Sequence, residues 1–167
     1  LREHEASLRA QSLGLNAPIF QRANERTVIG LNRTYKPETR TGIPRQWDEF
    51  VPQISAIPGS QGGDCFGVCW NNTGNCHFDY LTGVEVHQVD LIPTGMTWMS
   101  IPAGRYAVFA HSSHVSAIPG TIDTLWSKWG PDCGLKIAGS PFFERYTSEF
   151  NPATGMGGIE IWVPLAD

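Results

Sequence analysis

An internal repeat is the feature that most constrains the fold of this chain. Four residues of the first half recur in the second half, each displaced by 79 positions: Ile43, Trp47, Phe50 and Pro52 become Ile122, Trp126, Trp129 and Pro131. Apolar residues at i, i+4 and i+7 lie on one face of a helix, and a following proline is typical of a helix end. The sequence therefore predicts two related halves, each built around one amphipathic helix.

Strand-like segments surround each predicted helix. They are rich in β-branched and aromatic residues and are bounded by Gly, Pro and Asn. The expected strands are residues 27–32, 65–70 and about 80–88 in the first half, and 105–111, about 138–147 and 158–163 in the second. We therefore predict an α+β fold of duplicated strand–helix–strand–strand units with pseudo-two-fold symmetry. Its antiparallel sheet would carry two helices on one face and form a ligand cleft.

The length of 167 residues fits one domain. We place this domain at residues 19–167, with repeat units at about 25–90 and 103–165. Residues 1–18 lie outside the repeat as an N-terminal extension, in which residues 3–15 could form a short helix.

Composition excludes several classes of function. The net charge is −4 and Lys and Arg form no run, which argues against direct binding of nucleic acid. No apolar segment approaches the roughly 20 residues that a membrane span needs, and no signal peptide is evident. We therefore expect a cytoplasmic protein without a membrane partner.

The four cysteines do not indicate a disulfide framework in a chain of this length. A zinc site is the alternative, because Cys76 is followed by His77, but the spacing matches no recognised ligand set. We expect free thiols, no metal and no cofactor.

Six Trp, eight Phe and four Tyr could all fill a core, but together they favour an aromatic cavity. Strand alternation assigns their faces. Ile159, Ile161 and Val163 share the face expected to cover the helices, while Glu160 and Trp162 point the other way.

The same alternation places Phe142, Glu144 and Tyr146 on one face, and Phe66, Val68 and Trp70 on another. If these faces converge, they form an aromatic box with Glu144 and Glu160 at its base. Such a box attracts cations and planar rings, and a cation can pair with a carboxylate that would be costly to bury alone. The candidate ligand-binding residues are Glu144, Tyr146, Trp70, Phe66, Trp162, Glu160 and Phe142. The alternatives are a salt bridge of Glu144 with Arg145 or Arg105, and an ordinary exposed carboxylate for Glu160.

Several segments in order resemble the GyrI-like small-molecule-binding domains, which are also the effector-binding domains of many bacterial AraC-type and some MerR-type regulators. The similarity covers about Ile19 to Leu165. The matching segments are Gly30-Leu31, Tyr35 to Thr39, Ile43-Pro44-x-x-Trp47, Phe66 to Cys69, Phe78 to Val86, Ile101 to His111, Phe143 to Tyr146 and Ile159 to Pro164.

The resemblance implies the duplicated fold and a role for Glu144. In the multidrug-binding regulators of this family, the glutamate of the segment matching Phe143-Glu144-Arg145-Tyr146 contacts cationic ligands within aromatic walls. Trp70 falls where relatives have Phe or Tyr, and Trp162 lies on a matching strand. His111 is followed by Ser112 where relatives often have Gly, so we interpret His111 as structural.

The favoured function is a binding module for small hydrophobic compounds, aromatic or cationic, linked to transcription regulation. No segment ahead of Ile19 is long enough for a helix-turn-helix domain, so we expect a stand-alone binding protein or an excised effector domain. The first alternative is a hydrolase of reactive cyclopropane-bearing natural products with Glu144 as general base, as in similar stand-alone proteins. The second is a protein-binding module like the gyrase-inhibiting relatives. No Ser-His-Asp or Cys-His arrangement is evident, which favours binding over catalysis. The ligand and the oligomeric state stay open.

Overall fold

A computed structural model describes residues 1–72 and 76–166 of the chain. The chain divides into two compact units, each containing one copy of the repeated helix. The repeat-1 unit comprises Asn24–Ala103 and Ser140–Glu144. The repeat-2 unit comprises Leu1–Ala23, Gly104–Gly139 and Arg145–Asp167.

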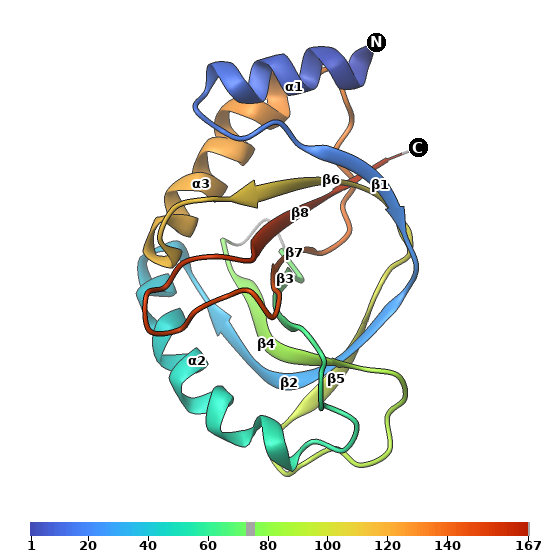
Figure 1. Ribbon diagram of the computed structural model, residues 1–167, viewed down its shortest axis with the longest axis vertical. Helices are drawn as coiled ribbons and strands as arrows, with labels where there is room; N and C mark the ends of the chain where they lie inside the picture. The colour runs from blue at the N-terminus through green and yellow to red at the C-terminus, as the bar shows by residue number, and fades with distance from the viewer. Residues whose placement is uncertain (73–75, 167) are drawn as a thin grey trace. The chain divides into compact units, whose positions relative to one another are not determined.

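Antiparallel strands form the sheet of the repeat-1 unit (Figure 1). Its strands are β2 (Arg26–Tyr35), β3 (Cys65–Trp70), β4 (Phe78–Val86) and β5 (Thr97–Ile101), with β7 (Phe142–Tyr146) contributing its first three residues. The hydrogen-bonded order is β7-β3-β4-β2-β5. The predicted strand 65–70 is confirmed in full, whereas β5 was missed.

The repeated helix of this unit is α2 (Ile43–Phe50), which confirms the predicted helix. It follows the 3₁₀ helix η1 (Pro37–Gly42) and leads into the 3₁₀ helix η2 (Val51–Ala56). Pro52 was expected to end the helix. It lies instead in the first turn of η2, so the helical segment continues past it. At that position the missing N–H of proline costs no hydrogen bond.

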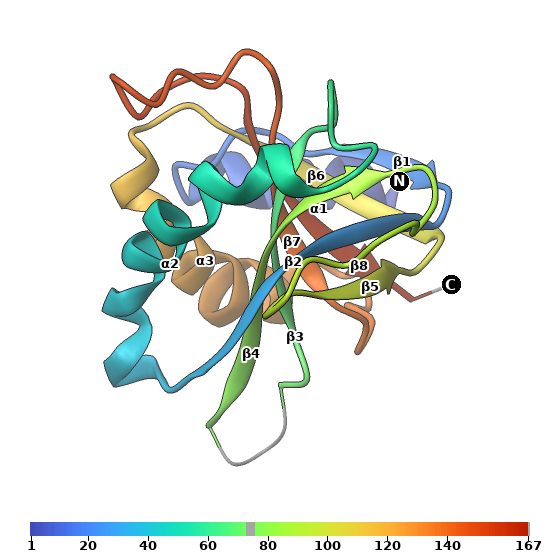
Figure 2. The ribbon, with the colours of Figure 1, turned by 90° about the horizontal axis from the view of Figure 1, so that it is seen from below.

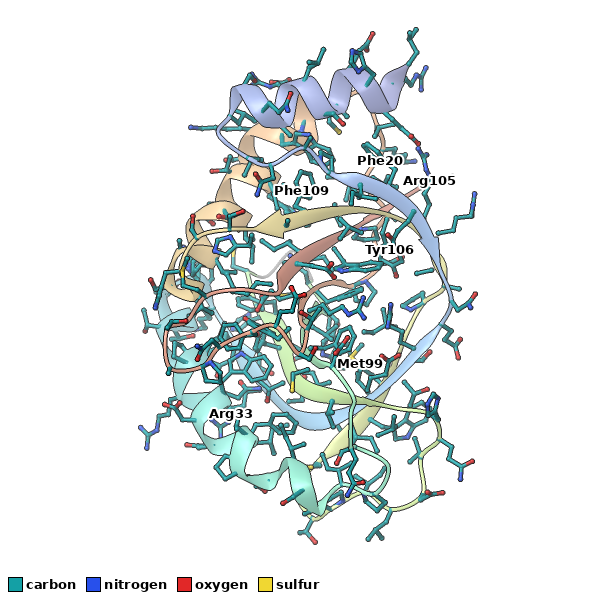
Figure 3. All side chains as sticks on the ribbon, viewed as in Figure 1. Phe20, Arg33, Met99, Arg105, Tyr106 and Phe109 are labelled. Atoms are coloured by element: carbon teal, nitrogen blue, oxygen red, sulfur yellow. The ribbon has the colours of Figure 1, made fainter. Side chains whose placement is uncertain are left out.

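The core of the repeat-1 unit lies between α2 and the sheet. Phe50 and Ile57 from the helical segment pack against Ile29, Val84 and Val86 from the strands, and all five are buried. An ion pair between Arg33 of β2, labelled in Figure 3, and Glu49 of α2 closes the rim of this contact. The Arg33 hydrogen bond lowers the pKa of Glu49.

The repeat-2 unit has the same helix-on-sheet plan. Its elements are α1 (Arg2–Ser12), β1 (Ile19–Ala23), β6 (Gly104–His111), η3 (Val115–Ala117), α3 (Ile118–Thr124), η4 (Leu125–Trp129), α4 (Gly130–Asp132) and β8 (Ile159–Leu165). The order β1-β6-β8 is antiparallel throughout. The second repeated helix thus runs from Ile118 to Asp132 through a π-helical turn, and Figure 2 shows it from a second side. Pro131 again lies inside a helical segment and does not end it.

The core of the repeat-2 unit confirms the predicted faces of β8. Ile159, Ile161 and Val163 are buried in one cluster with Trp129 of η4. Phe109 of β6 meets the Trp129 ring edge-on, with ring centroids 4.9 Å apart. Figure 3 shows Tyr106 on the other side of β6 from Phe109, and Tyr106 packs edge-on against Trp162 with centroids 5.4 Å apart.

The N-terminal segment contributes to this core. Ala6 and Ala10 of α1 are fully buried, and the Trp129 indole N–H donates to the carbonyl of Ala6 at 2.9 Å. Strand β1 pairs with β6, where Arg105 lies over the Phe20 ring at 5.8 Å (Figure 3). Residues 1–18 were expected to lie outside the repeat, and within them Ala6 and Ala10 of α1 join the buried cluster of the repeat-2 unit.

The α+β class and the antiparallel pairing of the strands are as predicted from the sequence. Among the described residues, no helix is both long enough and apolar enough to cross a lipid bilayer.

A substitution at Gly30 tests how closely β2 and β4 approach each other. Gly30 lies opposite Gly83, and a Cβ atom added at Gly30 would lie 1.7 Å from the carbonyl oxygen of Thr82. We expect Gly30→Ala to destabilise the protein by about 2–4 kcal/mol, because backbone must move to admit the methyl group. Chemical denaturation measures this. Gly104→Ala, where no atom lies within 4 Å of the added Cβ, is the control; equal stability of the two variants would contradict the packing described.

Candidate functional site

A buried carboxylate, Glu144, is the centre of the candidate site. Glu144 is 5% exposed, and its Oε1 accepts a hydrogen bond of 2.9 Å from the phenol of Tyr80 on β4. The same phenol oxygen accepts a hydrogen bond of 3.0 Å from the indole N–H of Trp47 on α2. Three elements of the repeat-1 unit, α2, β4 and β7, thus meet in one hydrogen-bonded chain that ends on a carboxylate.

Gly67 of β3 makes room for this chain. A Cβ atom at position 67 would lie 2.0 Å from the Tyr80 phenol oxygen and 2.9 Å from Glu144 Oε1. Any larger residue would therefore occupy the space in which the phenol and the carboxylate meet. A glycine inside a strand often marks such a close approach, and this signal was present in the sequence.

The two faces of β3 differ in what they contact. Glu144 lies on the face of Gly67, and this is the face that α2 covers through Trp47 and Tyr80. Phe66 lies on the opposite face, where its ring packs against Phe143 with centroids 5.5 Å apart. The expected convergence of Phe66 and Trp70 with Glu144 on one face is therefore not met, because Glu144 and Phe143 are consecutive and point to opposite sides.

Phe66 and Trp70 have partners within their own face. The guanidinium carbon of Arg26 lies 5.5 Å from the centre of the Phe66 ring, and Arg26 also binds Glu85 at 3.0 Å and 3.2 Å. The indole N–H of Trp70 donates to the side-chain oxygen of Asn32 at 2.9 Å. A cation from the protein itself thus already lies over Phe66.

Three other candidates lie in the repeat-2 unit. The indole N–H of Trp162 donates to Glu160 Oε1 at 3.1 Å, and Arg145 forms an ion pair with the same oxygen at 3.6 Å. Glu160 therefore has the kind of salt bridge that the sequence suggested as an alternative for Glu144. Tyr146 packs edge-on against Phe150 with centroids 5.1 Å apart. Phe142, the remaining candidate, is half-buried and precedes Glu144 by two residues in β7.

Sequence reasoning missed Tyr80 and Gln46 as parts of the site. Gln46 of α2 is fully buried, and its Nε2 donates to the backbone carbonyls of Leu31 at 2.9 Å and Tyr80 at 3.0 Å. Its Oε1 accepts a hydrogen bond of 2.6 Å from the Tyr35 phenol. A glutamine one position before the repeated tryptophan was the available signal, because it places an amide on the buried edge of an otherwise apolar helix face.

His111, which was expected to be structural, is buried at the end of β6. The residue is 7% exposed, and its Nε2 lies 3.0 Å from the carbonyl oxygen of His114. Its Nδ1 lies 3.4 Å from the hydroxyl of Thr121. These contacts join the end of β6 to the second repeated helix.

The electrostatics of the site act on Cys69, which shares the Gly67 face of β3. The residue as a whole is half-buried. Burial of its thiol raises the pKa of Cys69 well above the ordinary value, and the negative charge of Glu144 raises it further. Cys69 therefore stays a neutral thiol at physiological pH and adds no second negative charge beside Glu144.

This coupling predicts a change in thiol reactivity. Replacing Glu144 by Gln removes a negative charge that disfavours the thiolate, so the pKa of Cys69 should fall and its alkylation by iodoacetamide at about pH 8.5 should accelerate roughly two- to fivefold. Peptide mass spectrometry measures the rate at each cysteine. Cys65, on the same strand, is the control, because the causes that raise its pKa are burial and Asp64, which the Glu144→Gln change leaves in place. An unchanged Cys69-to-Cys65 rate ratio would contradict the coupling.

Comparison with known proteins places this chain among small-molecule-binding domains. A family model described as the GyrI-like small molecule binding domain matches residues 17–166. Transcriptional regulator BrlR of Pseudomonas aeruginosa is 27% identical over 125 residues, which make up 74% of this chain and 46% of BrlR. The chain thus spans about half the length of this relative.

Two solved structures share the fold. A putative bacterial transcription regulation protein from Staphylococcus aureus MU50 superposes with a TM-score of 0.69 at 19% identity, covering 90% of this chain and 98% of the other. The structure of SAV2435 bound to tetraphenylphosphonium superposes with a TM-score of 0.70 at 16% identity, covering 89% and 93%. These similarities confirm the predicted α+β fold. Together with the family match, they confirm the resemblance found in the sequence: the chain belongs to the GyrI-like small-molecule-binding domain family.

Proposed function

We propose that this chain is an effector-binding module that takes lipophilic aromatic cations and pairs their positive charge with Glu144. The observation that carries the proposal is the hydrogen-bonded chain from Trp47 through Tyr80 to a carboxylate that is 5% exposed. The module would bind its ligand without changing it chemically, and ligand binding would alter the activity of a transcription regulator.

Burial makes the carboxylate selective. Removing an ionised carboxylate from water is costly, and a hydrogen bond from a neutral phenol stabilises the charged form without cancelling its charge. A cation brought close to this carboxylate is attracted more strongly than it would be in water, because the surrounding dielectric constant is lower. An organic cation with aromatic rings loses little on leaving water, so it can reach such a position where a hydrated metal ion cannot.

The aromatic residues around the carboxylate suit such a ligand. The indole of Trp47 and the phenol of Tyr80 lie on the same face as Glu144, and Phe142 is its half-buried neighbour on β7. Aromatic faces attract cations by about 0.5–2 kcal/mol each. We keep Glu144 and Phe142 as proposed ligand contacts and add Trp47. Tyr80 is only 1% exposed, so its proposed role is to hold the carboxylate through its hydrogen bond.

The relatives support the same function. SAV2435 has been seen with tetraphenylphosphonium, a lipophilic aromatic cation. BrlR is a transcriptional regulator, and this chain matches a part of it. We therefore extend both properties, cation binding and a place in transcription regulation, to this chain as part of the proposal.

Binding of tetraphenylphosphonium tests the function. We expect the wild-type protein to bind this cation more tightly than neutral triphenylphosphine oxide, and Glu144→Gln to weaken cation binding by about 10- to 100-fold through loss of the charge pair. Affinity for the neutral compound should hardly change. Isothermal titration calorimetry measures both affinities.

Glu149→Gln is the matched control, because Glu149 is an exposed glutamate five residues further on. Equal affinity of the wild type and Glu144→Gln for the cation would refute the proposed role of the carboxylate. Recovery of the ligand by mass spectrometry in the same experiment separates binding from the hydrolase alternative, which requires a chemically changed product.

A further inference from the structure

The polar groups around Glu144 are confined to one copy of the repeat. The displacement of 79 positions relates Gln46, Tyr80 and Thr82 of the repeat-1 unit to Leu125, Ile159 and Ile161 of the repeat-2 unit. All six residues are buried on the helix-covered face of their own unit. The paired strand is displaced by 78 positions instead of 79, which keeps the same faces together. Tyr80 and Thr82 lie opposite Arg33 and Leu31 of β2, and Ile159 and Ile161 lie opposite His111 and Phe109 of β6.

The repeat-2 residues show that a simple apolar core suffices at these positions. In the repeat-1 unit the same three positions hold an amide, a phenol and a hydroxyl, and buried polar groups need hydrogen-bond partners that an apolar core does not require. Their presence in one copy alone therefore points to a use beyond packing.

Gln46 and Trp47, consecutive residues of α2, hold Tyr80 at both ends. The Gln46 amide donates to the backbone carbonyl of Tyr80 at 3.0 Å, and the Trp47 indole donates to its phenol at 3.0 Å. The phenol is thereby left to direct its own hydrogen at Glu144, at 2.9 Å. An accepted hydrogen bond from Trp47 fixes the direction in which the phenol can donate.

The chemistry of these contacts fixes the orientation of the Gln46 amide. Two carbonyl oxygens, those of Leu31 and Tyr80, can only accept, so the NH₂ group must face them. The amide oxygen then faces the phenol of Tyr35 at 2.6 Å. Burial raises the pKa of Tyr35, which keeps this phenol protonated and able to donate. Neither Glu nor Leu at position 46 could make the same set of bonds.

We propose that Gln46 is a positioning residue of the cation site, which acts through Tyr80 to hold the Glu144 carboxylate ionised and correctly oriented. This inference rests on the proposed function, because it concerns the affinity of the same carboxylate for a cation. Gln46 is too deeply buried to touch the ligand itself, with no exposed surface.

The test is a double-mutant cycle with tetraphenylphosphonium. Gln46→Leu installs the residue of the other repeat copy, and Tyr80→Phe removes only the phenol hydroxyl. We expect each single variant to bind the cation about tenfold more weakly, the size expected for disturbing one hydrogen bond to a charged group. The double variant should bind no more weakly than the worse single variant, because both changes act on one interaction.

The pH dependence of cation binding distinguishes this role from a purely structural one, because loss of packing alone would not shift the pH at which binding is half-maximal. Two titratable side chains that interact with Glu144 are Tyr80, through its hydrogen bond, and Cys69, whose pKa the Glu144 charge raises. Loss of the Tyr80 hydrogen bond disfavours the charged carboxylate, so cation binding in Gln46→Leu and Tyr80→Phe should need a higher pH to reach half its maximum. Gln53→Leu, an exposed glutamine exchanged in the same way, should leave affinity and pH profile unchanged.

The outcomes separate this inference from the function on which it rests. If the wild type fails to bind the cation, both are refuted. A second outcome is that the wild type binds the cation and Glu144→Gln does not. In that case the role of Gln46 alone is refuted if Gln46→Leu binds like the wild type, or if its loss of affinity adds fully to that of Tyr80→Phe. If Gln46→Leu does not fold, Tyr35→Phe decides, because it removes only the hydroxyl that orients the amide. Unchanged affinity and pH profile in Tyr35→Phe would then overturn the inference.

Discussion

A carboxylate buried against a helix-covered sheet face is the constraint on which the repeat-1 unit depends. Glu144 is stabilised there by the phenol of Tyr80, and the phenol is in turn fixed by Trp47. The strand beside them must carry Gly67, because a side chain at that position would fill the meeting point of phenol and carboxylate. The apolar residues Leu125, Ile159 and Ile161 at the matching positions of the repeat-2 unit show that the fold itself does not require this polar arrangement. Under the proposed function, the arrangement serves a ligand.

The sequence predicted the parts of the fold that follow from periodicity. The repeated spacing around Trp47 located α2 and its counterpart, and alternation placed Ile159, Ile161 and Val163 against the helices. The two missed strands, β1 and β5, are short and lie at sheet edges, where exposure removes the hydrophobic alternation that a pattern needs. The burial of α1 depends on alanines, which give little hydrophobic signal.

The candidate site was predictable only in part. Strand alternation proposed Glu144 together with Glu160, and the resemblance to a family then favoured Glu144. Alternation alone cannot say which neighbouring face a residue joins. That limitation explains the misplacement of Phe66 and Trp70. The pairing register of β7 beside β3 determines which β3 residues share a face with Glu144, and this register depends on tertiary structure. Tyr80 was part of a recognised segment, yet its role depends on the space left by Gly67. A polar residue at a position where the repeat copy is apolar is the sequence signal that would have found both Tyr80 and Gln46.

A crystal structure of the protein with tetraphenylarsonium would show directly whether the charge of a bound cation lies beside Glu144. Arsenic replaces phosphorus in a cation of the same shape, and its anomalous scattering locates the positive charge directly, whatever the orientation of the phenyl rings. We expect one strong anomalous peak within about 6 Å of the Glu144 carboxylate, the range over which opposite charges interact strongly. A fully occupied peak elsewhere, with Glu144 and Tyr80 undisturbed, would show that Glu144 does not pair with the cation.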